Sequence, residues 1–220
     1  MEVPSKPKIY HIVHIAGLSG IIQEGFVWCD AEMNKRSPSS EPSIGMGKVK
    51  QRRLNHLTLA SHPDLYVGQC VPFYFCPRSV MLYILHQGNH PDIDYRQGQA
   101  PIVHLEADLR QAVTWAQKKD KRWAFTLSNA GSNYFEDRCD LTQLHEIHWE
   151  AVQTDKWSGP GIPPDIKEAK QAEFLIEHSF PWELVERVGV ISERMLQKVS
   201  AIVAKSSHIP PVEVRRDWYY

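Results

Sequence analysis

The chain has 220 residues, 42% of them hydrophobic, so it can bury a sizeable core, and we expect a single domain over residues 1–220. Lys and Arg total 25 against 26 Asp and Glu, which excludes a molecule-wide field that attracts polyanions. Four cysteines without a CxxC pair, and no apolar run near the roughly 20 residues of a membrane helix, indicate a protein of the cell interior that crosses no membrane.

Apolar alternation and short apolar runs predict strands that are mixed along the chain with amphipathic helices. The predicted strands are 8–15, 70–77, 100–108, 122–128, 173–180, 187–193 and 212–220. The predicted helices are 14–25, 49–57, 79–88, 107–119, 141–152, 181–186 and 193–205. Two long connections, 29–48 and 129–168, show little regular apolar period. Because no βαβ unit repeats at a regular length, the pattern predicts an α+β fold.

Eleven histidines raise the question of metal binding, but their spacing argues against it. The stretch HEIHWEA, residues 145–151, resembles a zinc-protease helix, yet the HExxH pattern needs a histidine where Trp149 stands. The motifs GxGxxG, GxxxxGK[ST] and GxSxG do not occur, so the common nucleotide loops and the serine nucleophile elbow are absent. We therefore expect no metal site.

A run of basic residues, KVKQRR, places Lys48, Lys50, Arg52 and Arg53 within six positions. If these side chains converge, they can bind a small number of phosphates. The alternative is a charged helix face in contact with water, and the run taken alone favours this alternative.

The stretch VPFYFCPRSVMLY combines an aromatic strand with the start of a helix. Successive strand residues point to opposite faces, so Tyr74 faces away from Phe73 and Phe75. One of the two faces packs in the core, and the other is able to stack on a flat ring. The pattern does not decide between them.

Glu173 opens the apolar run EFLIEHSF, where burial of a carboxylate is costly. It lies either exposed at a sheet edge or at a functional site. Sequence periodicity alone supports these two interpretations equally.

Five blocks together resemble the DarT family of bacterial toxins, which are DNA ADP-ribosyltransferases encoded beside a macrodomain antitoxin. The blocks are IYHIVHI, QRR, VPFYFCPRSVMLY, KQAEFL with FPW, and RDWYY, and they follow that family's order over nearly the whole chain. The resemblance implies the ADP-ribosyltransferase fold, a split mixed β-sheet with peripheral helices and a cleft for NAD. The two long connections are much less diagnostic of the family.

The resemblance also implies roles for individual residues. Glu173 matches the family's catalytic glutamate, and Arg53 matches an arginine near the reaction centre. His11 matches the residue that hydrogen-bonds a ribose of NAD, while either Tyr74 or Phe75 flanks the nicotinamide. The full set of predicted NAD contacts is His11, His14, Arg53, Tyr74, Phe75 and Met81.

The implied reaction transfers ADP-ribose from NAD to a base, thymidine, in single-stranded DNA in a sequence-dependent way. We expect Lys48, Lys50 and Arg52 to bind phosphates, the loop 30–48 to cover NAD, and the excursion 129–168 to hold the strand. Alternatives are another acceptor, such as guanosine, RNA or protein, and a non-catalytic module that binds nucleic acid. The resemblance further implies a macrodomain antitoxin as partner and the bacterial cytoplasm as location.

Overall fold

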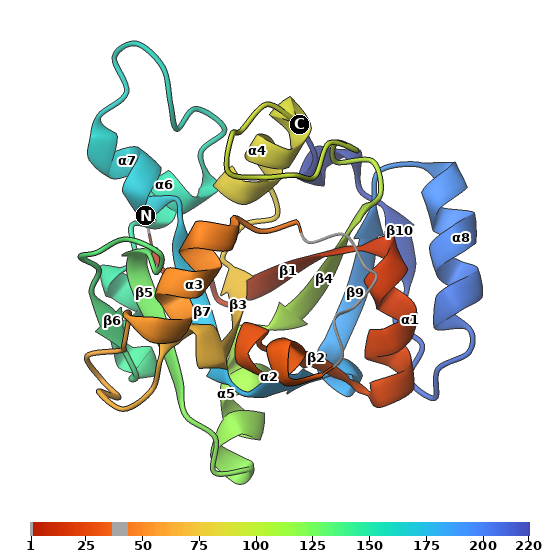
Figure 1. Ribbon diagram of the computed structural model, residues 1–220, viewed down its shortest axis with the longest axis horizontal. Helices are drawn as coiled ribbons and strands as arrows, with labels where there is room; N and C mark the ends of the chain where they lie inside the picture. The colour runs from red at the N-terminus through yellow and green to blue at the C-terminus, as the bar shows by residue number, and fades with distance from the viewer. Residues whose placement is uncertain (1, 37–43) are drawn as a thin grey trace.

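The computed structural model describes residues 2–36 and 44–220, and an eight-stranded mixed sheet with helices on both faces dominates it (Figure 1). The strands are β1 Lys8–His14, β3 Cys70–Tyr74, β4 Ile102–Asp108, β5 Trp123–Asn129, β6 Asp137–Arg138, β7 Ala172–Glu177, β9 Val185–Val190 and β10 Val212–Val214. Their spatial order is β10-β9-β4-β1-β3-β7-β5-β6. Strands β9 and β10 run parallel, whereas the other neighbouring strands run antiparallel. A small second sheet joins β2 Phe26–Trp28 to β8 Ser179–Pro181.

The helices begin and end at residues with clear local reasons. They are α1 Ile15–Glu24, α2 Asp30–Lys35, α3 Gly47–Asn55, α4 Val80–Gln87, α5 Leu109–Lys118, α6 Trp149–Gln153, α7 Pro164–Ala169 and α8 Glu193–Val203, with 3-10 turns η1 Val67–Gln69, η2 Leu141–Glu146, η3 Trp182–Leu184 and η4 Arg216–Trp218. Asp108 caps α5 by accepting the backbone N–H groups of Arg110 and Gln111. Gly88 ends α4 in the left-handed conformation that glycine adopts without strain.

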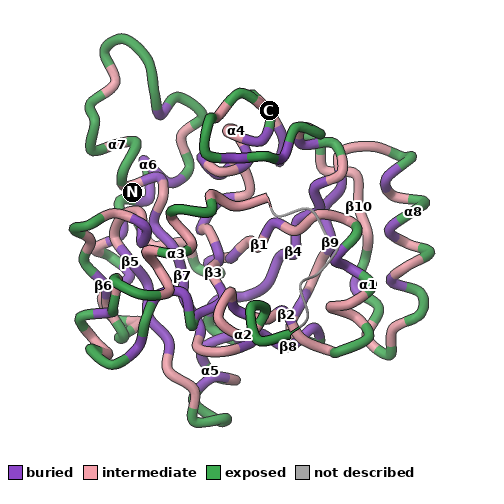
Figure 2. The backbone as a smooth tube through the Cα atoms, in the orientation of Figure 1, coloured by how far each residue is buried: buried purple, intermediate pink, exposed green. Residues whose placement is uncertain are grey.

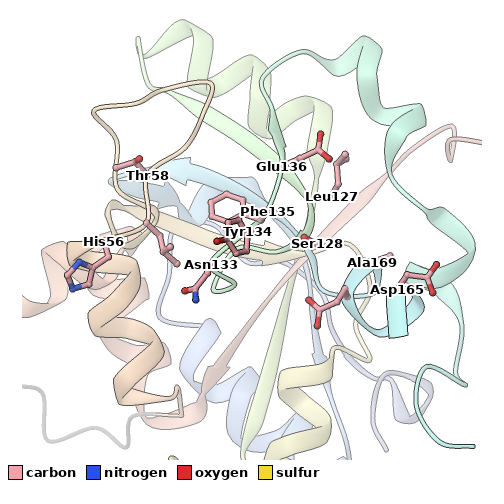
Figure 3. Close-up of a pocket in the computed structure, with 12 residues that line it drawn as sticks. His56, Thr58, Leu127, Ser128, Asn133, Tyr134, Phe135, Glu136, Asp165 and Ala169 are labelled. Atoms are coloured by element: carbon pink, nitrogen blue, oxygen red, sulfur yellow. The ribbon is translucent and has the colours of Figure 1, made fainter. Parts of the chain in front are cut away.

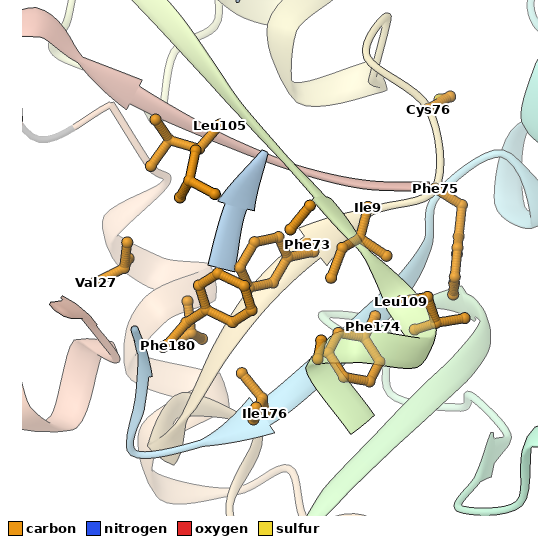
Figure 4. Close-up of a cluster of buried hydrophobic side chains, with 14 of the residues drawn as sticks. Ile9, Val27, Phe73, Phe75, Cys76, Leu105, Leu109, Phe174, Ile176 and Phe180 are labelled. Carbon is orange, nitrogen blue, oxygen red and sulfur yellow. The ribbon is translucent and has the colours of Figure 1, made fainter. Parts of the chain in front are cut away.

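One face of the sheet carries a continuous apolar core. Its strands contribute alternating side chains such as Ile9, Phe73 and Phe174, and Figure 4 shows these packed together with Val27 and Phe180. The helices that cover this face are α1, α5 and α8, whose buried residues belong to the same cluster. The predicted apolar face of α5 is confirmed, because Leu109, Ala112, Val113 and Ala116 are all buried.

The opposite face carries two separate apolar clusters instead of one. The first lies over β1 and β4 and contains Ile12, Ile102 and Trp218 together with Leu82 and Leu85 of α4. The second lies over β5 and β7 and contains Leu59, Leu65, Val67, Ala124 and Leu175. Between the two clusters lie more polar positions, and α3 crosses the sheet there, in front of β3 and β7 (Figure 1).

The structure corrects several predicted segments. The predicted helix 181–186 is wrong, because this stretch holds the end of β8, the 3-10 turn η3 and the start of β9. The run 173–180 is not one strand, because His178 has a φ of 70° and the chain leaves β7 there to enter the second sheet as β8. The connection 29–48 contains α2 and the start of α3, while residues 37–43 of the loop predicted to cover NAD lie outside the described residues. The last predicted strand, 212–220, stops at Val214, and Trp218 is buried from a 3-10 turn.

Candidate active site

Glu173 and Arg53 form a bidentate ion pair between β7 and α3. Arg53 Nη2 lies 2.9 Å from Glu173 Oε2, and Nη1 lies 3.3 Å from Oε1. The two side chains are 13% and 2% exposed, so the pair is largely removed from water. Burial, the largest influence, lowers the pKa of Arg53, but the charge and hydrogen bonds of Glu173 outweigh it and leave that pKa above its ordinary value.

Glu173 is not at the exposed sheet edge, because it lies inside β7 and is fixed by β5. Its backbone N–H donates to Thr126 Oγ1 at 3.0 Å, and its Oε1 accepts the backbone N–H of Ala130 at 3.3 Å. The register between β5 and β7 shifts after Phe125, which brings the residues that follow β5 against the carboxylate. The carboxylate therefore has hydrogen-bond donors from two directions.

Helix α3 reaches Glu173 because it packs directly on the 3-10 turn η1. A Cβ atom added at Gly68 would lie 2.8 Å from Leu54 Cδ2 and 2.9 Å from Leu54 Cα, so only glycine allows this approach. Leu54 precedes the last residue of α3 and follows Arg53. The close packing thus sets the height of the guanidinium above the sheet.

Tyr74 lies on the same face of the sheet as Glu173. It pairs in register with Glu173 on one side and with Tyr10 on the other, so the three side chains share a sheet face. Burial and the charge of Glu173 raise the pKa of Tyr74, which keeps its hydroxyl protonated. Phe75 is buried in the core on the other face against Trp149, with ring centroids 5.5 Å apart, so of the two aromatic residues Tyr74 is the one that shares a face with Glu173.

The sheet is split between β1 and β3, next to Tyr74 and Glu173, and His11 lies at this split. Strands β1 and β3 share the single register pair Tyr10–Tyr74. Beyond it, His11 Nδ1 lies 2.8 Å from the carbonyl oxygen of Pro72, a residue without an N–H to donate. A carbonyl only accepts, so Nδ1 carries the proton and Nε2 is an acceptor. Burial lowers the pKa of His11, and the neutral ring suits a hydroxyl donor such as ribose.

His14 and Met81 lie on the same side of the sheet as Tyr74. His14 Nδ1 accepts the N–H of Ala16 at the start of α1, so its Nε2 carries the proton. That Nε2 is buried and has no hydrogen-bond partner among the described residues, so a polar group of a ligand fits there. Met81, on α4, packs at the edge of the cluster that also borders Tyr74.

The predicted phosphate-binding residues do not converge. Lys48 pairs with Asp92 at 2.7 Å, Lys50 pairs with Asp30 at 2.9 Å, and the guanidinium of Arg52 donates to the carbonyl of Gly131. Each therefore connects α3 to a different neighbouring segment. Lys48 is 83% exposed and remains accessible to a phosphate, whereas Arg52 is committed to the turn that presents Ala130 to Glu173.

A groove of about 740 Å³ lies on the β5 side of the molecule, and its lining residues do not include Arg53 or Glu173 (Figure 3). Its walls come from the end of α3, from the turn after β5 and from α7, so the excursion before Glu173 forms much of it. The lining residues include His56, Thr58, Ser128, Asn133, Tyr134 and Asp165. Tyr134 is 92% exposed at its rim, and α7 is mostly exposed as well (Figure 2).

Sequence patterns gave no sign of Thr126, Ala130 or Gly68, because none of them is charged or part of a motif. Within residues 2–36 and 44–220, no group of three or more His, Cys, Asp or Glu side chains is placed to hold a metal ion. No helix in the same ranges is long and apolar enough to cross a membrane.

Comparison with known proteins agrees with this geometry. The family model described as ssDNA thymidine ADP-ribosyltransferase, DarT, matches residues 10–220. A DNA ADP-ribosyl transferase of Thermus sp. (strain 2.9) is 36% identical over 219 residues, which are 99% of this chain and 98% of that protein. The structure of Thermus sp. 2.9 DarT in complex with ADP-ribosylated ssDNA matches with a TM-score of 0.87 at 34% identity, over 100% of this chain and 99% of the other.

The structure of Thermus sp. 2.9 DarT in complex with NAD+ matches with a TM-score of 0.82 at 32% identity, over 100% of both chains. These similarities confirm the predicted α+β ADP-ribosyltransferase fold, and the chain belongs to the DarT family.

Proposed function

We propose that this protein transfers ADP-ribose from NAD, its substrate, to a thymidine base in single-stranded DNA and releases nicotinamide. The observation that carries the proposal is the buried pair of Glu173 and Arg53 beside the split of the sheet. Family membership supports the same reaction.

Glu173 is proposed to act on the sugar. When the bond between nicotinamide and ribose C1′ breaks, its electron pair leaves with nicotinamide, and positive charge develops on the ribose as in glycoside cleavage. A fixed carboxylate stabilises that charge without reorganisation, because its hydrogen bonds already hold it. Arg53 and Ala130 supply those hydrogen bonds in the structure.

Arg53 is proposed to act on the acceptor. A thymine ring nitrogen attacks C1′ only as it loses its proton, which passes to Glu173 while the new nitrogen–carbon bond forms. The guanidinium next to the carboxylate stabilises the negative charge that the ring acquires. Tyr74, His11, His14 and Met81 are proposed to hold NAD on the other side of the pair.

The groove lined by β5, the turn after it and α7 is proposed to hold the DNA strand. Its exposed aromatic residue, Tyr134, offers a face on which a base stacks, an interaction of about 1–3 kcal/mol per base. Single-stranded DNA fits such a groove because its bases are free, whereas a paired base must first be extruded. Lys48, which pairs with Asp92 but is 83% exposed, is proposed to add a phosphate contact.

The experiment is mass spectrometry of short DNA strands of varied sequence after incubation with NAD, for the wild type and for Glu173→Gln. We expect thymidine-containing strands to gain one ADP-ribose, and the variant to lose about 10²-fold to 10³-fold in rate. Glu177→Gln is the matched control, since Glu177 lies on the same strand and face and also pairs with an arginine, Arg122. Full activity of Glu173→Gln, or transfer only to guanosine, RNA or protein, contradicts the assignment.

We further propose, from family membership, that a macrodomain antitoxin is the partner and that the protein acts in the bacterial cytoplasm. A non-catalytic nucleic-acid-binding module remains the alternative function. It predicts DNA binding that needs no NAD and that leaves the DNA unmodified.

A further inference from the structure

Lys170 is a buried cation three residues before Glu173. It follows α7, is 2% exposed, and forms no ion pair within the described residues. Its Nζ lies 2.9 Å from the carbonyl oxygen of Val152, 2.8 Å from that of Thr154, and 3.6 Å from Cys76 Sγ.

The three contacts of Lys170 match the three N–H groups of an ammonium. Both carbonyls act only as acceptors, and a sulfur at 3.6 Å is also able to accept. A neutral amine has two N–H groups and leaves one contact unmade. The carbonyls belong to the end of α6 and the residue after it, where backbone oxygens lack partners within the helix.

Stability alone is a weak reason for this arrangement. Burying a charge costs several kcal/mol, and an apolar side chain of similar volume is often equally stable or more so. The contacts instead have a geometric result, because they join three segments that surround the site. Cys76 follows β3 two residues after Tyr74, Thr154 begins the connection from α6 to α7, and Lys170 leads into β7.

The junction between α7 and β7, residues Lys170 and Gln171, is also held on its other side. Gln171 Oε1 accepts the side-chain N–H of Asn129 at 3.1 Å, which ties the junction to the end of β5. Helix α7, which leads into β7, contributes Asp165, Glu168 and Ala169 to the wall of the groove. The junction between α7 and β7 is thus held from both sides, and it sets how far the groove wall stands from the carboxylate.

We propose that Lys170 is a positioning residue for the DNA acceptor: it fixes the wall of the groove relative to Glu173. The inference rests on the proposed function, since it names a residue that this reaction needs. Lys170 itself is proposed to contact neither NAD nor DNA. Its loss is expected to displace the DNA strand while the NAD side, formed by β1, β3 and α4, keeps its shape.

The test is the variant Lys170→Met, with Lys167→Met on the exposed side of α7 as matched control. We expect the KM for a thymidine oligonucleotide to rise about 10-fold to 100-fold, because small displacements of a reacting group have effects of this size. The dissociation constant for NAD, measured by calorimetry, is expected to stay within about 2-fold of the wild type. Lys170→Arg, which keeps the positive charge, is expected to recover part of the loss.

Cys76→Ala removes the longest of the three contacts without changing Lys170, and it decides the case if Lys170→Met does not fold. We expect a smaller rise in the same KM and no change in NAD binding. An unchanged KM in the folded variant, or an equal loss of NAD affinity, overturns the inference. If the wild type itself modifies no DNA, the proposed function fails, and that result is distinct from a failure of the Lys170 assignment.

Discussion

The two faces of the sheet differ in how they use the same strands. On one face the side chains form a continuous apolar core under α1, α5 and α8. On the other face two smaller clusters leave a polar position between them, where Glu173, the register partner of Tyr74, pairs with Arg53 of α3. Along β7 these roles alternate residue by residue, so that Phe174 packs in the core while Glu173 pairs with Arg53. One strand thus joins the stable part of the molecule to its reactive part.

The largest effect should come from the core face. Phe174→Ala is expected to lower the free energy of unfolding by about 3–5 kcal/mol, because Phe174 is fully buried between Phe73 and Trp123. Denaturant unfolding measures the change. Tyr134→Ala, an exposed aromatic residue at the groove, is the control and should change it by less than about 0.5 kcal/mol. If both variants lost a similar amount of unfolding free energy, the larger role of the core face in stability would be contradicted.

His104 provides a pH test of the cluster over β1 and β4. Burial lowers the pKa of His104 to about 4, while its ordinary value is 6.5, so the folded state favours the neutral ring. Its contribution is complete above the unfolded pKa and is lost as pH falls from about 6.5 to about 4, a change of about 3 kcal/mol. Unfolding measured across this range should show the full loss in the wild type and in His145→Gln, an exposed control. The loss should be smaller in His104→Phe, where His11, whose pKa burial also lowers, still contributes.

Thr126 tests whether a hydrogen bond from β5 holds Glu173 in place. Thr126→Val keeps the shape but leaves the buried N–H of Glu173 without an acceptor, which should cost about 1–3 kcal/mol of stability and slow the reaction. Thr114→Val, on the exposed side of α5, is the matched control. If thermal unfolding and transfer rate are both unchanged in Thr126→Val, the hydroxyl does not position Glu173.

The smallest effect is expected at Lys48, on the outer side of α3. If Lys48 contacts one phosphate, Lys48→Gln should reduce the slope of log affinity against log salt by about 1 while the preferred DNA sequence stays the same. Lys198→Gln, on α8 at the opposite face, should leave the slope unchanged. Fluorescence anisotropy over a range of salt concentrations measures both, and equal slopes for wild type and Lys48→Gln contradict the contact.

Much of the fold could be predicted from the sequence, because long periodic segments such as α5 have one buried face that their spacing reveals. The break at His178 could not, since no glycine or proline stands there and only tertiary pairing with β2 requires it. Helix α2 was missed because it has no buried residue and hence no apolar stripe.

The site was predictable only in part. Family resemblance, and not periodicity, paired Glu173 with Arg53, which is 120 positions away in the chain. The basic run predicts a surface for phosphates, whereas the structure pairs its residues with Asp92, Asp30 and Gly131. These partners come from segments that the sequence does not bring together. Contacts of this kind depend on the three-dimensional arrangement.

The single register pair between β1 and β3 has a mechanical consequence. Between β1 and β3 the two parts of the sheet are joined by the register pair Tyr10–Tyr74 and by the hydrogen bond from the His11 imidazole to the carbonyl of Pro72. A dinucleotide that lies across this split links both parts, so its binding free energy adds to their cohesion. With a dinucleotide bound, the amide protons of both β1 and β3 should exchange with solvent more slowly than in the free protein.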